Sequence, residues 1–168
     1  MRLRVQDLEE KTTGKNLYSY QKGAIDQIFE RFENSPDDYH LLYQLPTGGG
    51  KTVIFSEIVR QYLKHHKTRV LVLTHRIELC KQTSKMLTEF GVVNKIINSK
   101  AKLDDQDDYS CFVAMVETLN NRLNDNVLDI SDIGLVIIDE AHYNSFTKLF
   151  KFFHKSFILG VTATPLSS

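Results

Sequence analysis

The chain of 168 residues has no tryptophan, three prolines and two cysteines, and its net charge is zero. Cys80 and Cys111 form no Cys-x-x-Cys pair, so reduced thiols are expected and no zinc site is predicted. Because 21 basic residues balance 21 acidic ones, overall charge gives no argument for nucleic-acid binding. No apolar stretch approaches the roughly 18 residues of a membrane-spanning helix, and the start lacks a signal-peptide pattern. We therefore expect a cytoplasmic protein with no membrane partner.

The composition present is that of a globular domain. Apolar residues make up 42% of the chain and charged residues 25%. A chain of this length buries roughly 70% of the surface that it exposes when unfolded, which is enough for a core without metal or disulfide support. The polar start predicts a loose leader over 1–16, followed by one domain over 17–168.

Short apolar runs alternate with amphipathic segments along the chain. Helices are expected at 20–32, 51–65, 77–90, 118–124 and 146–154, and strands at 40–45, 69–74, 92–97, 110–116, 135–139 and 157–161. The strands are continuous apolar runs, which is typical of parallel strands that are covered on both faces. The pattern predicts the α/β class, a three-layer sandwich with a mostly parallel central sheet.

A glycine loop joins the first expected strand to the next helix. It reads Pro46-Thr47-Gly48-Gly49-Gly50-Lys51-Thr52. Glycines let backbone N–H groups approach a phosphate, and the N-terminus of the helix adds the positive end of its dipole. Lys51 would reach the β- and γ-phosphates, and the Thr52 hydroxyl would bind Mg²⁺. The loop predicts a P-loop for ATP and Mg²⁺, the alternative being a glycine turn before a helix.

Two adjacent carboxylates follow a later strand. The apolar run 135–138 leads directly into Asp139 and Glu140, and carboxyl ends of parallel strands are where open α/β sheets bind ligands. Asp139 is predicted to hold Mg²⁺, and Glu140 to orient and deprotonate the water that attacks the γ-phosphate. Alone, such a pair could also be the acidic N-cap of a helix.

Six blocks in order resemble the motifs of superfamily-two helicases. Asp139-Glu140-Ala141-His142 resembles motif II of the DEAH-box branch, and Lys51 lies in the counterpart of motif I. The segments 70–79, 113–119 and 159–165 resemble motifs Ia, Ib and III, and Tyr20-Gln21 resembles the Q-motif. The sequences of segments 74–76 and 160–165 are similar to those of the group of type III restriction subunits and excision-repair helicases.

The resemblance implies a RecA-like lobe of a two-lobed ATP-dependent helicase or translocase, with motifs IV to VI on a second lobe beyond this chain. It implies hydrolysis that is weak in this lobe alone, and movement on DNA or RNA, with DNA favoured. The amide of Gln21 can match the donor and acceptor edge of adenine. The remaining implied roles are nucleic-acid contacts by Thr74, His75, Arg76 and Thr118, and coupling of phosphate state to nucleic acid by His142, Thr162 and Thr164.

Other functions stay open at this point. A GTPase is disfavoured because Asn94-Lys95 is followed by Ile97, where guanine recognition needs a carboxylate. A kinase or another P-loop enzyme without a nucleic-acid partner, and a non-catalytic nucleotide-binding module, are the remaining alternatives. The segment Thr74-His75-Arg76 is equally well explained as the capped start of a helix.

Overall fold

The computed structural model describes residues 17, 19–35, 40–44, 50–125, 131–139, 152–153 and 155–162. Its elements follow in chain order: α2 (Ser19–Glu33), β1 (His40–Gln44), α3 (Lys51–His65), β2 (Arg69–Thr74), α4 (Ile77–Glu89), β3 (Asn94–Ile97), the 3₁₀ turn η1 (Gln106–Asp108), β4 (Cys111–Met115), α5 (Val116–Asn124), β5 (Ile133–Asp139) and β6 (Phe157–Thr162). The expected leader, and the expected helix at 146–154 except for residues 152 and 153, lie outside the described residues.

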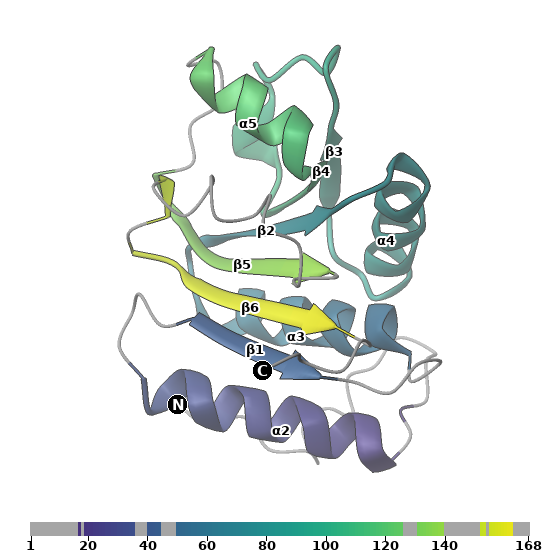
Figure 1. The fold of residues 1–168 in the computed structure, drawn as a ribbon, viewed down its shortest axis with the longest axis vertical. Helices are drawn as coiled ribbons and strands as arrows, with labels where there is room; N and C mark the ends of the chain where they lie inside the picture. The colour runs from purple at the N-terminus through teal and green to yellow at the C-terminus, as the bar shows by residue number, and fades with distance from the viewer. Residues whose placement is uncertain are drawn as a thin grey trace, which may run out of the picture.

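Six strands form one sheet in the order β1-β6-β5-β2-β4-β3, and every neighbouring pair is parallel. The arrowheads of β1, β6, β5 and β2 in Figure 1 accordingly point to one side. The expected α/β class with a parallel sheet is therefore confirmed. None of the described helices has the length and hydropathy that a membrane crossing needs.

Helices cover both faces of the sheet because the central strands are apolar on both. In β2, Val70 and Val72 belong to the core that includes α2 and α3, while Leu71 and Leu73 face the core that includes Leu119 of α5. All four of these β2 side chains are completely buried. The alternation of neighbouring residues between two cores is what makes the strand a continuous apolar run.

Most boundaries agree with the expected ones within one residue, but β3, β5 and α5 begin two residues away from their expected starts, β3 at Asn94 and not at residue 92. The strand β5 begins at Ile133, two residues before the expected start, because Gly134 interrupts the apolar run without ending the strand. The helix α5 begins at Val116 and not at Thr118, directly after β4, so that Thr118 lies inside its first turn.

Candidate nucleotide-binding site

The parallel sheet brings predicted site residues to its carboxyl edge. β1 ends at Gln44, next to the glycine loop, and β5 ends at Asp139, while β2 and β6 end at Thr74 and Thr162. Gln44 is paired in register with Thr162, and Asp139 with Val161. Segments that are far apart in sequence therefore meet at one edge, as the strand pattern predicts.

Gly50 ends the glycine loop and caps α3 in a conformation that favours glycine. Its backbone is left-handed, with φ 72° and ψ 45°, and its carbonyl accepts the first helical hydrogen bond from Ile54 at 3.0 Å. A Cβ on Gly50 would lie 2.4 Å from Nε2 of Gln21. Gln21 is buried in α2, with 3% of its surface exposed. The structure thus brings together two residues that the sequence assigned separately to the nucleotide.

Lys51 and Asp139 meet across the site as an ion pair. Nζ of Lys51 donates a hydrogen bond to Oδ1 of Asp139 at 3.1 Å, and the two side chains are 20% and 8% exposed. Lys51 is the first residue of α3 and Asp139 the last of β5, so this bond joins helix and sheet. Partial burial strengthens the pair relative to one in open water. Lys51 and Asp139 each carry the charge opposite to that of the ligand predicted for them.

The donors at this edge fit the chemistry of Mg²⁺ with a nucleotide. Thr52, half-buried in the first turn of α3, offers a hydroxyl, and Asp139 offers a carboxylate. Mg²⁺ prefers such oxygen ligands and is commonly held by one or two carboxylates together with substrate phosphates. Within the described ranges no group of three or more His, Cys, Asp or Glu could hold a metal by itself. The donor set therefore suits a metal that arrives with the nucleotide.

Seven of the predicted site residues lie outside the described residues: Pro46, Thr47, Gly48, Gly49, Glu140, His142 and Thr164.

Thr74 faces the interior. It is completely buried, and its Oγ1 donates to the carbonyl oxygen of Arg76 at 3.2 Å and lies 3.0 Å from Sγ of Cys80. Burial raises the pKa of the Cys80 thiol, although the hydrogen bond with Thr74 opposes the shift. Thr74 therefore holds the turn between β2 and α4, and Cys80, which the sequence treated as featureless, anchors it. In the sequence, Cys80 follows Thr74 by six residues and falls in the first turn of the next helix, which is the signal that could have indicated their contact.

The other nucleic-acid candidates differ in accessibility. Arg76 is exposed and precedes α4, whereas His75 and Thr118 are half-buried. Thr162, one of the predicted coupling residues, is completely buried at the end of β6. Arg76 is thus the predicted contact that is most open to a polynucleotide backbone.

Sequence comparison matches residues 14–167 with the family model described as "Type III restriction enzyme, res subunit". The chain is 35% identical over 150 residues to "Putative ATP-dependent helicase IRC3" of Saccharomyces cerevisiae, an alignment covering 83% of the chain and 21% of that protein. It is 27% identical over 171 residues to "ATP-dependent DNA helicase MPH1" of Debaryomyces hansenii, covering 92% and 15%. The chain thus spans about a fifth or less of these relatives.

Solved structures support the fold. The UvsW helicase from bacteriophage T4 superposes with a TM-score of 0.71 at 21% identity, covering 98% of this chain and 61% of that one. The SWI2/SNF2 ATPase core of Sulfolobus solfataricus, solved in complex with dsDNA, gives a TM-score of 0.72 at 19% identity over 92% of this chain and 33% of that one. The RecA-like fold of helicases is therefore present.

Proposed function

Because the chain belongs to the type III restriction enzyme res-subunit family, we propose that it is the ATP-binding lobe of a nucleic-acid helicase or translocase. The observation that carries the proposal is the ion pair of Lys51 and Asp139 beside the left-handed Gly50. A glycine cap, a lysine at the helix start and a carboxylate on the neighbouring strand end are the parts that a phosphate and Mg²⁺ require. The relatives are named as ATP-dependent helicases, so a kinase or a non-catalytic module is not favoured.

In this mechanism the residues of the edge exchange partners. Lys51 leaves Asp139 and binds the β- and γ-phosphates, while the backbone after Gly50 and the N-terminus of α3 hold the phosphate oxygens. Asp139 and Thr52 are then available to hold Mg²⁺, which would neutralise charge on the phosphates. Both charged groups keep an opposite charge beside them throughout.

The residues outside the described ranges take the roles that the sequence suggests. Pro46, Thr47, Gly48 and Gly49 complete the loop around the phosphates, and Glu140 orients the attacking water and accepts its proton. Gln21 either contacts adenine or supports the backbone of Gly50. Its position against Gly50 favours the second role. His142, Thr162 and Thr164 link the phosphate state to the nucleic acid.

The nucleic acid is proposed to be DNA, since MPH1 is named as a DNA helicase and the SWI2/SNF2 core was solved with dsDNA. Arg76, His75 and the start of α5 near Thr118 follow neighbouring strands at the carboxyl edge, where they can contact backbone phosphates. A cytoplasmic location, expected from the sequence, is part of the same proposal.

A second RecA-like lobe is proposed to complete the motor. An arginine that reaches the γ-phosphate accelerates hydrolysis by about 10³- to 10⁵-fold in P-loop enzymes, and in two-lobed motors the second lobe supplies it. This chain alone should bind nucleotide and hydrolyse it slowly. Rapid turnover of the 168-residue chain, stimulated by nucleic acid, would contradict this part of the proposal.

The decisive test compares Lys51→Ala with Lys85→Ala, a matched loss of an exposed lysine on α4. Mg-ADP should raise the melting temperature of the wild type and of Lys85→Ala, and should leave Lys51→Ala unchanged. The increment caused by the ligand is the quantity to compare, because Lys51→Ala also leaves Asp139 without its partner. If Mg-ADP raised the melting temperature of Lys51→Ala as much as that of the wild type, Lys51 would not be part of the nucleotide site.

Binding of the polynucleotide is tested by salt dependence. Contact with two or three phosphates predicts a log–log slope of about 2 for single-stranded DNA, since roughly 0.7 counterions are released per phosphate neutralised. Arg76→Ala should reduce the slope by somewhat less than one. A slope that Arg76→Ala leaves untouched would favour the alternative that this segment only caps α4.

A further inference from the structure

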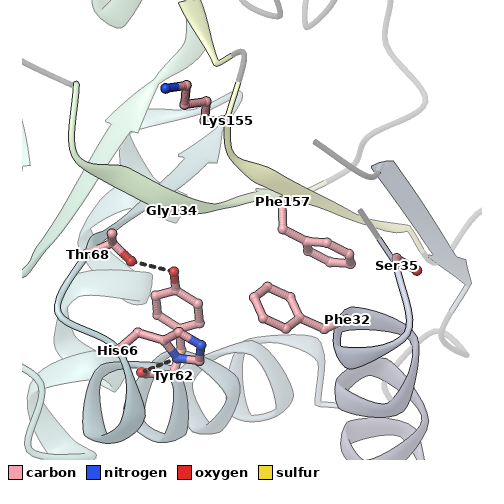
Figure 2. A pocket seen from close by; sticks show the side chains of 8 residues that line it. All are labelled: Phe32, Ser35, Tyr62, His66, Thr68, Gly134, Lys155 and Phe157. Carbon is pink, nitrogen blue, oxygen red and sulfur yellow. Dashed lines mark hydrogen bonds between the residues drawn. The ribbon is translucent and has the colours of Figure 1, made fainter. Parts of the chain in front are cut away.

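A pocket of about 270 Å³ opens at the amino edge of the sheet, opposite the nucleotide site (Figure 2). Gly134, at its floor, and Asp139 lie on the same strand, five residues and therefore about 16 Å apart. The pocket is thus separate from the edge that binds phosphate. Its lining residues are Phe32, Ser35, Tyr62, His66, Thr68, Gly134, Lys155 and Phe157.

The floor of the pocket depends on a glycine. The hydroxyls of Tyr62 and Thr68 share a hydrogen bond of 2.5 Å directly over Gly134. A Cβ on Gly134 would lie 2.2 Å from the Tyr62 hydroxyl and 2.3 Å from Oγ1 of Thr68. The bare glycine therefore allows this hydrogen bond, which in turn fixes the ring of Tyr62.

Four rings from α2, α3, the residue after α3 and β6 form the apolar wall. Tyr62 and His66 stack in parallel with centroids 4.2 Å apart, and Phe32 lies edge-on to both at 5.7 Å. Phe32 also contacts Phe157 at 4.6 Å. Figure 2 shows the rings of Tyr62 and Phe157 on different sides of the opening. Such edges and faces are the surfaces against which another aromatic ring packs.

His66 gives this wall a directed polar atom. Its Nδ1 lies 3.1 Å from the carbonyl oxygen of Tyr62. Because a carbonyl oxygen only accepts, Nδ1 is the donor in this hydrogen bond, and in that tautomer Nε2 is an acceptor. In Figure 2 this second nitrogen is on the side of Phe32. The pocket therefore accepts a hydrogen bond from a ring N–H or a hydroxyl.

Charge and size restrict the occupant further. The lining residues include one lysine, Lys155, and no aspartate or glutamate. Figure 2 shows the amino group of Lys155 at the outer margin, directed away from the rings, where it can face carboxylates that flank an occupant. Ligand pockets usually measure about 300–1,000 Å³, so this one is at the small end of the range and suits a single ring.

We infer that the pocket docks a partner protein through one tryptophan or tyrosine side chain that acidic residues flank. The anchor ring packs among Phe32, Tyr62 and Phe157 and donates to Nε2 of His66, while the flanking carboxylates face Lys155. Aromatic anchors in small, well-walled pockets are the residues that dominate many protein interfaces. These 168 residues contain no tryptophan, so a tryptophan anchor lies outside them.

The absence of tryptophan also provides the assay. The probe is a blocked peptide of sequence Asp-Asp-Trp-Asp-Asp, whose tryptophan fluorescence is observed without a signal from the protein. Titration of the chain should shift the emission to the blue and give saturable binding. A peptide with lysines in place of the aspartates should bind at least fivefold more weakly. Failure of the acidic peptide to bind, or equal binding of both peptides, overturns the inference.

Two variants assign the binding to this pocket. Phe32→Ala, which removes part of the wall, should weaken binding at least tenfold. Lys155→Glu should weaken it about threefold to fivefold, whereas Lys85→Glu, the same charge change on α4, should have no effect. Circular dichroism and thermal unfolding confirm that each variant is folded. Undiminished binding to folded Phe32→Ala overturns the assignment.

Two other occupants are outcomes of the same experiment. A short single-stranded oligonucleotide that displaces the peptide from the wild type would show that the pocket takes nucleobases and would overturn the protein partner. A dimer in sedimentation velocity that Phe32→Ala abolishes would show that a second copy of this chain, through a tyrosine, fills it and would likewise overturn the inference. Neither result depends on nucleotide binding, so the helicase proposal is tested separately.

Discussion

At the carboxyl edge of the sheet the key charged pair is Lys51 with Asp139, which we propose to exchange partners, whereas the amino edge holds a pair joined by several hydrogen bonds. There Arg69 of β2 makes a forked ion pair with Asp132, at 2.7 to 2.9 Å, and its guanidinium lies over the ring of Phe112. In the proposed mechanism, the pair at the carboxyl edge changes its interactions when a ligand binds, whereas the pair at the amino edge keeps them. The same parallel sheet supplies both, because it collects all strand ends of one kind on one side.

The helix α3 connects the two edges. It begins with Lys51 beside Asp139, and it ends beside His66, which stacks on Tyr62 at the amino edge. Differences in stability and ligand binding between variants at its two ends therefore measure how independent the edges are.

The largest expected effect on stability is at the amino edge. Gly134→Ala should lower the free energy of unfolding by about 2–3 kcal/mol, because its Cβ overlaps two hydroxyls that already bond each other. Gly23→Ala in α2 is the control, since nothing lies within 4 Å of its Cβ, and it should be neutral or slightly stabilising. Urea denaturation measures both. Equal stability of Gly134→Ala and wild type would show that Tyr62 and Thr68 move apart from the added Cβ without cost.

Gly50→Ala tests the carboxyl edge. The left-handed backbone should cost about 1–2 kcal/mol of stability, and Mg-ADP affinity should fall at least tenfold, since the loop and Gln21 must both move. Gly91→Ala is the matched control: Gly91 also has a positive φ, of 78°, but its Cβ would meet nothing within 4 Å. Gly50→Ala should lose somewhat more stability than Gly91→Ala in chemical denaturation, because only its Cβ meets Gln21, and calorimetry should find the loss of affinity in Gly50→Ala only. A comparable loss of affinity in Gly91→Ala would assign the effect to general destabilisation.

A smaller effect is expected for Arg69→Lys, which keeps the charge and loses the fork. We expect a loss of about 1 kcal/mol, because the side chain of Asp132 is half exposed and water screens the pair. The loss should shrink at high salt in denaturant titrations if the ion pair is its cause. A loss that does not change with salt would indicate that the packing of Arg69 on Phe112 is the larger contribution.

The smallest expected effect concerns the middle of α3. Burial raises the pKa of Glu57, and its hydrogen bond with Arg60, at 2.8 Å to Nε, opposes the shift. The folded state therefore holds this proton more tightly than the unfolded state does. The resulting stability is present in full below the ordinary pKa of 4.5 and is lost as pH rises through the raised folded value.

Glu57→Gln should consequently flatten the dependence of unfolding free energy on pH just above 4.5. Denaturant titrations across that range measure the slope. Glu78→Gln, at an exposed position in the first turn of α4, is the control and should leave it unchanged. Identical slopes for Glu57→Gln and wild type would contradict the pKa shift.

Much of the fold could be predicted because central parallel strands need apolar residues on both faces. The same rule misplaced the start of β5, where Gly134 has no side chain to count as apolar. Lys51 and Asp139 were predicted for one site from the strand ends that they follow. Their direct bond was not, because it joins residues 88 positions apart and depends on the order of strands in the sheet.

Side-chain direction was the information that sequence patterns lacked. Thr74 stands at a strand end, where a hydroxyl can face a phosphate or the core, and its bond with Cys80 shows that it faces the core. The pocket at the amino edge was not predicted, since Phe32, Tyr62 and Phe157 each fit an ordinary apolar pattern. Only the tertiary arrangement places their rings around one opening.

The pairing of β1 with β6 sets the order in which the nascent chain can become active. In the described sheet β1 is the outermost strand and its hydrogen-bonded neighbour is β6, with His40 beside Ile158. During translation, at about 5–20 residues per second, β2, β4 and β5 emerge and can pair before β6 exists. The strand that leads into the glycine loop must wait for residues 157–162 to leave the ribosome. In the proposed function, this lobe therefore acquires nucleotide binding only after β6 has emerged, and ribosomes stalled before residue 157 should display chains that Mg-ADP does not protect from protease.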